Sequence, residues 1–100
     1  MKIFGLKIAE AFCRRHTDAR NWMENWIADA EAASWKTPYD IKVRYSSASF
    51  LAGNVVIFNV KGNSYRLETI VAYKAGVVAL TWAGTHAGYN ARNRQRRRRN

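Results

Sequence analysis

The clearest pattern of apolar and polar positions lies between residues 55 and 73, and it predicts a β-hairpin. Residues 55–61 are mostly apolar and β-branched, and residues 64–73 alternate between apolar and polar positions. The dipeptide Gly62-Asn63 between them suits a two-residue type II′ turn, in which glycine supplies the positive φ of the first position. Counting outward from this turn predicts the pairing of the residues in both strands.

This pairing divides the hairpin into two faces, because successive side chains of a strand point to opposite sides. The apolar face is expected to join the core, and it comprises Phe58, Val60, Tyr65 and Leu67. The polar face is expected to present a basic, hydrogen-bonding surface, and it comprises Asn59, Lys61, Ser64 and Arg66. Glu68 continues the polar face, and we favour a structural salt bridge there over a role as general base.

Two helices are predicted before the hairpin, after a short strand at Ile3 and Phe4. Residues 6–16 carry apolar side chains at helical spacing, and Thr17 or Asp18 suits the N-cap of a second helix. We interpret the apolar stripe of this second helix as core packing against a sheet rather than as a binding groove. The stripe consists of Trp22, Met23, Trp26, Ile27, Ala30 and Ala33.

Breaks in the pattern predict the remaining elements. Pro38 closes the helical region, and residues 39–45 suit one further short helix. Phe50 and Leu51 are expected to be buried anchors. A turn is then expected at Gly53-Asn54, just before the hairpin.

A last strand is predicted over residues 77–83. The expected register pairs Tyr73 with Val78, Val71 with Leu80 and Thr69 with Trp82. Those side chains share the apolar face with Leu67, so this face stays apolar across three strands. Helices followed by strands of this kind indicate an α+β fold.

The composition is that of one folded domain. The chain has 100 residues, of which 48% are hydrophobic and 13% aromatic, so it can form one core of modest size. No apolar run approaches the roughly 20 residues that span a bilayer, and charged residues near the N-terminus argue against a signal peptide. Cys13 is the only cysteine, which excludes an internal disulfide and fits a reducing cytoplasm. No cluster of metal ligands or glycine-rich phosphate loop is visible, so no cofactor is expected.

The charge is strongly positive and concentrated at the end of the chain. The formal net charge is +10, and arginines crowd residues 92–99. Such a run cannot bury apolar surface and repels itself, so residues 91–100 are predicted to form a disordered tail after a folded domain of residues 1–90. The rest of the chain is also basic, which favours a polyanionic partner such as nucleic acid or the ribosome surface.

Residues that can bind phosphate and move protons are predicted to gather after the last strand. His86 and Tyr89 are three residues apart, so a helical turn would place them on one side, near the polar face that carries Lys61 and Arg66. Lys74 is separated from Arg66 by an even number of residues and is expected on the same face. This set suits metal-free RNA cleavage, in which a ribose 2′-hydroxyl attacks the adjacent phosphate.

Each of these residues also has an ordinary structural interpretation. A single histidine after a strand is more often a loop or capping residue, and Tyr89 can simply pack against the sheet. Arg66 can pair with Asn59 across the hairpin or with an acid such as Glu68. Taken alone, the residues indicate a basic α+β domain that binds RNA, with catalysis as one option.

An ordered set of residues along the chain resembles the HigB-type toxins, which belong to the RelE-like group of bacterial toxin–antitoxin systems. The resemblance extends from about Lys7 to Tyr89. It is carried by Trp35-Lys36-Thr37-Pro38, Asp40-Ile41-Lys42, Tyr45, Ser47-Ala48-Ser49-Phe50-Leu51, Asn54-Val55-Val56-Ile57-Phe58-Asn59-Val60, Gly62-Asn63, Tyr65-Arg66-Leu67 and Gly84-Thr85-His86 with Tyr89.

This resemblance implies two N-terminal helices packed on a small, mostly antiparallel sheet. It implies a metal-independent endoribonuclease that cleaves mRNA on the ribosome, and a HigA-like helix-turn-helix antitoxin that neutralises it in the cytoplasm. The catalytic positions carried over by matching residues are Arg66, His86 and Tyr89. The residues expected to bind RNA or phosphate are Lys61, Lys74, Asn59, Arg92 and Arg94.

Three positions depart from the family pattern. Ser64 stands where the family usually has a lysine, and Gly88 and Asn90 stand where it commonly has Glu and Asp. The arginine tail is a further departure. One rival hypothesis is therefore a degenerate, non-catalytic protein that binds RNA or the ribosome and blocks translation by occupancy. A third is a folded core that carries a nonspecific arginine-rich anchor.

Overall fold

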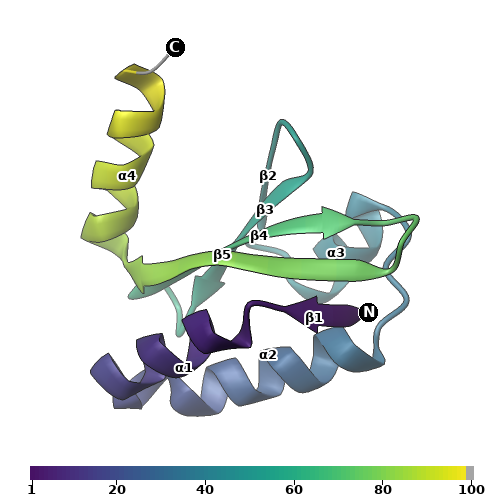
Figure 1. The fold of residues 1–100 in the computed structure, drawn as a ribbon, viewed down its shortest axis with the longest axis horizontal. Helices are drawn as coiled ribbons and strands as arrows, with labels where there is room; N and C mark the ends of the chain where they lie inside the picture. Colours follow the sequence, from purple (N-terminus) through teal and green to yellow (C-terminus); the bar gives the residue numbers. More distant parts are fainter. Residues whose placement is uncertain (99–100) are drawn as a thin grey trace.

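Five strands form one mixed sheet in the order β1-β5-β4-β3-β2. The edge strand β1 runs parallel to β5, and the other neighbouring strands are antiparallel. This computed structural model describes residues 1–98 (Figure 1). In chain order its elements are β1 (Lys2–Phe4), α1 (Leu6–Arg15), the 3₁₀ turn η1 (Thr17–Ala19), α2 (Arg20–Ala32), α3 (Pro38–Arg44), β2 (Ser49–Leu51), β3 (Val55–Val60), β4 (Tyr65–Ala72), β5 (Val77–Thr85) and α4 (His86–Arg98).

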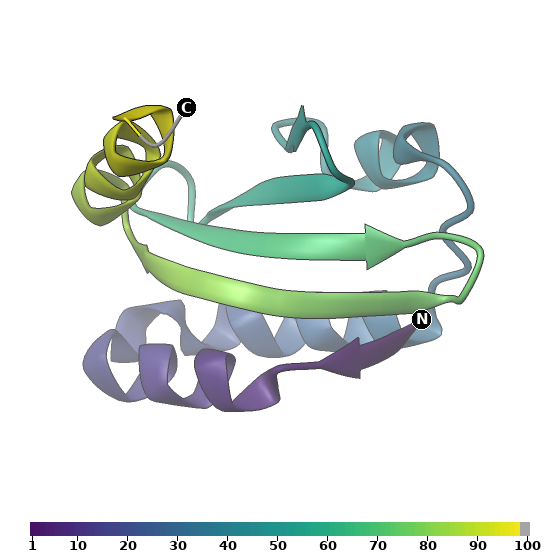
Figure 2. The same ribbon diagram turned by 45° about the horizontal axis from the view of Figure 1, so that its top comes forward.

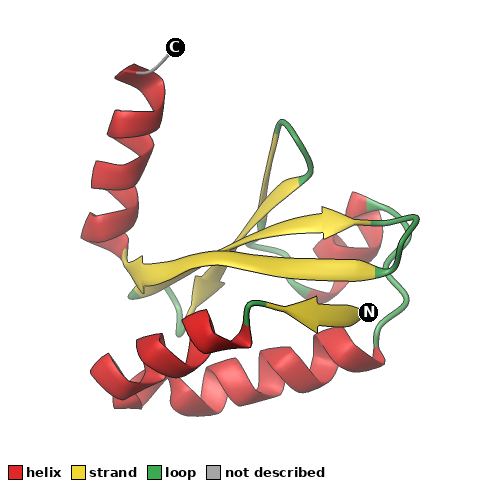
Figure 3. Cartoon of the chain, in the orientation of Figure 1, coloured by secondary structure: helices red, strands yellow, loops and turns green. Residues whose placement is uncertain are grey.

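The helices lie on both sides of this sheet. Helices α1 and α2 run side by side along one face, and α4 lies on the other side at the end of β5 (Figures 1 and 2). Figure 3 shows α4 directly following the last strand. The predicted α+β fold, with two N-terminal helices packed on a mostly antiparallel sheet, is confirmed.

The core lies between the two N-terminal helices and the apolar face of the sheet. Trp26 of α2 meets Phe58 of β3 edge-on, with their ring centroids 5.2 Å apart. Phe12 of α1 and Leu67 of β4 are fully buried beside them. The apolar stripe of α2 therefore packs in the core, as its spacing predicts.

The central hairpin has the predicted register. Val60 pairs with Tyr65 and Phe58 with Leu67, while Asn59 faces Arg66 on the opposite side of the sheet. Gly62 takes the positive φ that the turn requires, at 68°. Lys61 also has a positive φ of 50°, so it belongs to the turn rather than to the ladder.

The register between β4 and β5 differs from the prediction. Thr69 pairs with Leu80 and Val71 with Val78, and a β-bulge lies between Glu68 and Thr69. Each of these two partners is displaced by two residues from the expected one. On the Thr69 side of the bulge, a shift of two residues keeps each side chain on its expected face, and alternation alone cannot detect such a shift. On the Glu68 side, Glu68 pairs with Trp82, so the ladder is displaced by one residue and Trp82 lies on the opposite face from the expected one.

Two local predictions are wrong. Leu51 is 39% exposed instead of buried, because β2 is a short strand at the edge of the sheet. Neither Thr17 nor Asp18 caps α2, since both lie in η1 and the helix has no side-chain cap. The Asp18 carboxylate instead accepts hydrogen bonds from Lys61 and Tyr65.

Helix α4 continues through residues for which the sequence predicts disorder. It extends from His86 to Arg98, and only residues 99 and 100 of the predicted tail lie outside the described residues. Arg92 and Arg96 form ion pairs with Glu68 of β4. These ion pairs with the sheet offset the repulsion between the arginines. The composition of the tail does not indicate them, because Glu68 lies far from the tail in the sequence.

Candidate functional site

The candidate site lies where β4 begins and β5 ends, beside the first turn of α4. Arg66 is the second residue of β4, and His86 is the first residue of α4. The Arg66 Nη2 atom lies 3.2 Å from Nδ1 of His86. Because a guanidinium can only donate, this contact requires Nδ1 to accept, which leaves the proton of a neutral imidazole on Nε2.

The backbone positions His86 within this site. Its N–H donates to the carbonyl oxygen of Ser64 at 3.2 Å, which ties the start of α4 to the hairpin turn. The Thr85 hydroxyl accepts from the N–H of Gly88 at 3.0 Å and so satisfies one of the free donors in the first turn of the helix. The helical turn that would bring His86 and Tyr89 to one side is therefore present.

The hairpin turn orients Arg66. Its Nη2 donates to Oδ1 of Asn63 at 2.7 Å, and its Nη1 donates to the backbone oxygens of Tyr65 at 3.0 Å and Asn63 at 3.3 Å. The side chain is half-buried. These bonds hold the guanidinium toward His86, and the alternation of the strand gave no sign that Asn63 would take part.

Tyr89 lies on the same helix as His86, three residues further on, as its spacing predicts. Its ring is half-buried, with its centroid 6.2 Å from that of Trp82 on β5. Trp82 also lies under the guanidinium of Arg92, 5.8 Å from the ring centroid. The expected register puts Trp82 on the apolar face. The bulge places it opposite Glu68 instead.

Glu68 forms the most buried charged group near the site. It is 4% exposed. Its two carboxylate oxygens accept from Nε and Nη2 of Arg92 at 3.1 and 3.0 Å, from Arg96 at 2.7 Å and from the Thr81 hydroxyl at 2.8 Å. The predicted salt bridge is therefore present.

These bonds decide the ionisation of Glu68. Burial raises its pKa, but the hydrogen bonds from Arg92, Arg96 and Thr81 outweigh this effect and lower the pKa to about 2. So acidic a carboxyl has little affinity for a proton at neutral pH. A role for Glu68 as general base is therefore disfavoured, as the sequence already suggested.

Two other residues predicted to bind RNA lie near Arg66 but have partners of their own. Asn59 lies beside Arg66 on the neighbouring strand, and its side chain reaches the Ser47 carbonyl oxygen at 3.5 Å. Lys61 lies at the turn, but its ammonium pairs with Asp18 at 3.1 Å. Both residues lie at the margin of the site.

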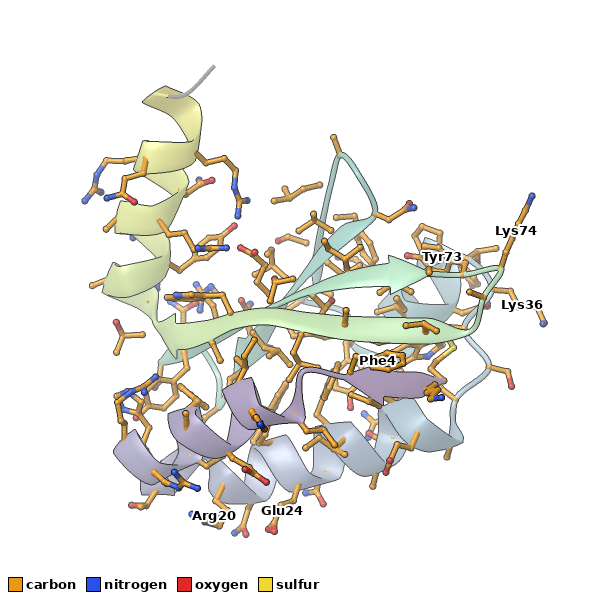
Figure 4. The ribbon with its side chains drawn as sticks, in the orientation of Figure 1. Phe4, Arg20, Glu24, Lys36, Tyr73 and Lys74 are labelled. Atoms are coloured by element: carbon orange, nitrogen blue, oxygen red, sulfur yellow. The ribbon has the colours of Figure 1, made fainter. Side chains whose placement is uncertain are left out.

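Lys74 does not join the site. It lies in the turn after β4 rather than in the strand, so its parity with Arg66 has no meaning. Figure 4 shows Lys74 at the opposite end of the sheet from α4. From Arg66 to Ala72, β4 spans about 20 Å at the usual rise per residue of a strand, and Lys74 lies beyond that end. Lys74 therefore does not line this site, and its binding of phosphate stays a prediction.

The two arginines predicted from the tail differ in their surroundings. Arg92 is half-buried and forms an ion pair with Glu68, whereas Arg94 is exposed on α4. Of the two, Arg94 is the one that projects into solvent.

Within residues 1–98 no group of three or more His, Cys, Asp or Glu side chains could hold a metal ion. In the same part of the chain, no helix combines the length and the apolar character needed to cross a membrane.

A comparison with protein families found a match to a toxin family. The family model described as the RelE-like toxic component of a toxin–antitoxin system, the HigB toxin, matches residues 19–92. The match covers most of the chain and includes Arg66, His86, Tyr89 and Arg92. A search of curated proteins found no match.

Proposed function

Because the chain belongs to the HigB family of RelE-like toxins, we propose that it is a ribosome-dependent mRNA endonuclease that arrests translation. The contact between Arg66 and His86, at 3.2 Å, is the observation that carries the proposal. It joins a permanent cation to an imidazole, whose ring nitrogens can donate or accept a proton. Cleavage of an RNA phosphodiester requires both functions in one place.

The reaction needs no nucleophile from the protein. The 2′-hydroxyl of a ribose loses its proton and attacks the adjacent phosphorus, the bond from phosphorus to the 5′-oxygen breaks, and that oxygen gains a proton. The products are a 2′,3′-cyclic phosphate and a 5′-hydroxyl end. Arg66 stabilises the negative charge that develops on the phosphorane oxygens.

His86 carries a proton in this scheme, as the acid or as the base. With Nδ1 accepting from Arg66, Nε2 carries the proton of the neutral ring and faces the substrate as a donor. Action as a base at Nε2 requires the other tautomer, in which Nδ1 no longer accepts from Arg66. Tyr89 orients the phosphate or donates a proton from the next position on the same side of α4. The ribose 2′-hydroxyl makes the reaction specific for RNA.

Two partners follow from this function. The substrate is mRNA on the ribosome, in the cytoplasm, and the basic surface of the chain favours contact with ribosomal RNA. A toxin of this family implies an antitoxin, and we propose that it is a HigA-like helix-turn-helix protein that neutralises the enzyme.

The test is to map mRNA 5′ ends shortly after induction of the protein. New 5′-hydroxyl ends inside translated codons are expected with the wild type and should be lost in Arg66→Ala and in His86→Ala. The matched controls are Arg14→Ala, an exposed arginine of α1, and His16→Ala, the other histidine. Both controls should retain the ends. Full cleavage by either site variant would refute the assignment of the site.

The same experiment addresses the non-catalytic alternative. Ser64, Gly88 and Asn90 favour that alternative, because they replace a lysine and two acids of the family pattern. Arrested translation without any new 5′ ends would support a protein that blocks the ribosome by occupancy and would refute the proposed cleavage.

A further inference from the structure

Helix α4 is seated on two side chains that face each other across β4 and β5. Glu68 pairs directly with Trp82 in the antiparallel ladder. Trp82 contacts the first two turns of α4 through Tyr89 and Arg92. Glu68 contacts the helix further along, through Arg92 and Arg96. We call Glu68 and Trp82 the α4 seat.

The ionic half of this seat is specific in geometry. Arg92 binds both carboxylate oxygens of Glu68 through Nε and Nη2, and Arg96 lies one helical turn further on. The Glu68 side chain is 5% exposed, whereas those of Arg92 and Arg96 are 38% and 37% exposed. The arginines thus remain within reach of solvent while a buried carboxylate holds them.

The seat has two consequences for the proposed site. His86 begins the helix that the seat holds, so the tilt of α4 sets the position of its imidazole relative to Arg66. The same carboxylate also occupies two cations that would otherwise be free for phosphate. The Glu68 carboxylate and the phosphates of RNA therefore compete for the N–H donors of Arg92 and Arg96.

We propose that Glu68 is a positioning residue that aligns His86 with Arg66 by holding α4, and that it withholds Arg92 and Arg96 from RNA phosphates. This inference rests on the proposed function for its effect on cleavage. It predicts opposite effects of one substitution: removal of the Glu68 charge weakens catalysis and strengthens RNA binding. A role in stability alone would weaken both.

The test compares Glu68→Gln with the wild type in the full chain. Binding is measured on a 2′-O-methyl RNA oligonucleotide, which cannot be cleaved, over a series of salt concentrations. Cleavage is measured in a single turnover on ribosome-bound mRNA. The control is Glu24→Gln, the same change of charge at an exposed residue of α2, which Figure 4 shows far from α4.

For Glu68→Gln, we expect cleavage to fall by roughly tenfold to a hundredfold, the usual cost of a displaced catalytic group. We expect its RNA affinity to rise, with a salt dependence steeper by about 0.7 for each arginine released. Glu24→Gln adds the same net charge without releasing an arginine. It should match the wild type in cleavage and show no such change in slope.

A second variant separates the two parts of the inference. Arg92→Gln with Arg96→Gln also loosens α4, but it leaves no arginine to release. Its cleavage should fall as in Glu68→Gln, while its RNA affinity should not rise. Hydrogen exchange of the α4 amides should increase in both variants.

Several outcomes would overturn the inference. They are unchanged cleavage in Glu68→Gln, weaker RNA binding in that variant, or equal gains in affinity in Glu68→Gln and Glu24→Gln. Absence of cleavage by the wild type would instead refute the proposed function. The RNA affinities and the hydrogen exchange of the α4 amides would then still show whether Arg92 and Arg96 are released from Glu68.

Discussion

The indole of Trp82 lies directly against Gly84, two residues further along β5. A β-carbon at Gly84 would lie 2.7 Å from the Cζ2 atom of Trp82 and 2.8 Å from Cη2. No side chain can approach so closely, so Gly84 is required for the position of the ring. Trp82 in turn contacts Tyr89 and Arg92 of α4. The absence of a side chain at Gly84 therefore allows Trp82 to take the position in which it contacts the helix.

Substitution of Gly84 by alanine should displace this ring. We expect Gly84→Ala to lower the free energy of unfolding by about 1–3 kcal/mol, the usual cost of overpacking. Gly88→Ala is the comparison, because its β-carbon would meet Thr85 Oγ1 at 3.1 Å and Trp82 at 3.4 Å, and alanine favours a helix by up to about 1 kcal/mol. Urea unfolding followed by tryptophan fluorescence measures both. Equal destabilisation by the two variants would contradict this account.

Asn63 should support catalysis without supporting the fold. Its side-chain oxygen binds Arg66 at 2.7 Å in an exposed turn. We expect Asn63→Ala to lower cleavage by roughly tenfold, because Arg66 loses its orientation, while the free energy of unfolding changes by less than about 0.5 kcal/mol. Asn25→Ala, at an exposed residue of α2, is the control. A loss of stability as large as the loss of activity would argue for a structural role instead.

A lysine at position 64 should increase activity. The Ser64 side chain is exposed, and its backbone oxygen already binds the N–H of His86, so Ser64→Lys would add a cation beside the site without changing that contact. We expect faster cleavage of ribosome-bound mRNA and tighter binding of RNA. Ser34→Lys adds the same charge at an exposed loop residue. If both variants gain equally, net charge rather than position explains the effect.

Acid should weaken the attachment of α4. Hydrogen bonds from the two arginines and Thr81 outweigh burial and hold the Glu68 pKa at about 2, below the ordinary value of 4.5. A lowered pKa stabilises the folded state above the ordinary value, and this contribution is lost as the pH falls from about 4.5 toward 2. The shift corresponds to about 3 kcal/mol at most.

This dependence can be measured by hydrogen exchange of the α4 amides and by unfolding between pH 5 and pH 2. The wild type should lose more stability over this range than Glu68→Gln, which has no group to titrate at position 68. Parallel losses in the two proteins would assign the acid sensitivity to other carboxylates.

The periodicity of the sequence was sufficient for the central hairpin and the helices. Phe58 and Leu67 are both fully buried, and Asn59 faces Arg66, because alternation and a glycine turn leave one register that buries the apolar face. The spacing of His86 and Tyr89 placed them on one side of any helical turn that starts at His86, and α4 starts there. The family resemblance was confirmed by the match over residues 19–92.

Other features depended on contacts between distant residues. The bulge between Glu68 and Thr69 pairs Glu68 with Trp82, and a β-bulge has no signal in the alternation of a strand. Lys74 was assigned to the site by parity, but the strand ends before it. Parity has meaning only within a continuous strand.

By itself, the sequence determined the α+β class, the two faces of the central hairpin and the residues that line its polar end, because these depend on local periodicity. Only the tertiary structure decided how α4 lies on the sheet. The order of Arg92 and Arg96 depends on Glu68, which is 24 and 28 residues earlier in the chain. Repulsion within the tail is a local property, whereas the buried carboxylate that offsets it is brought there by the fold.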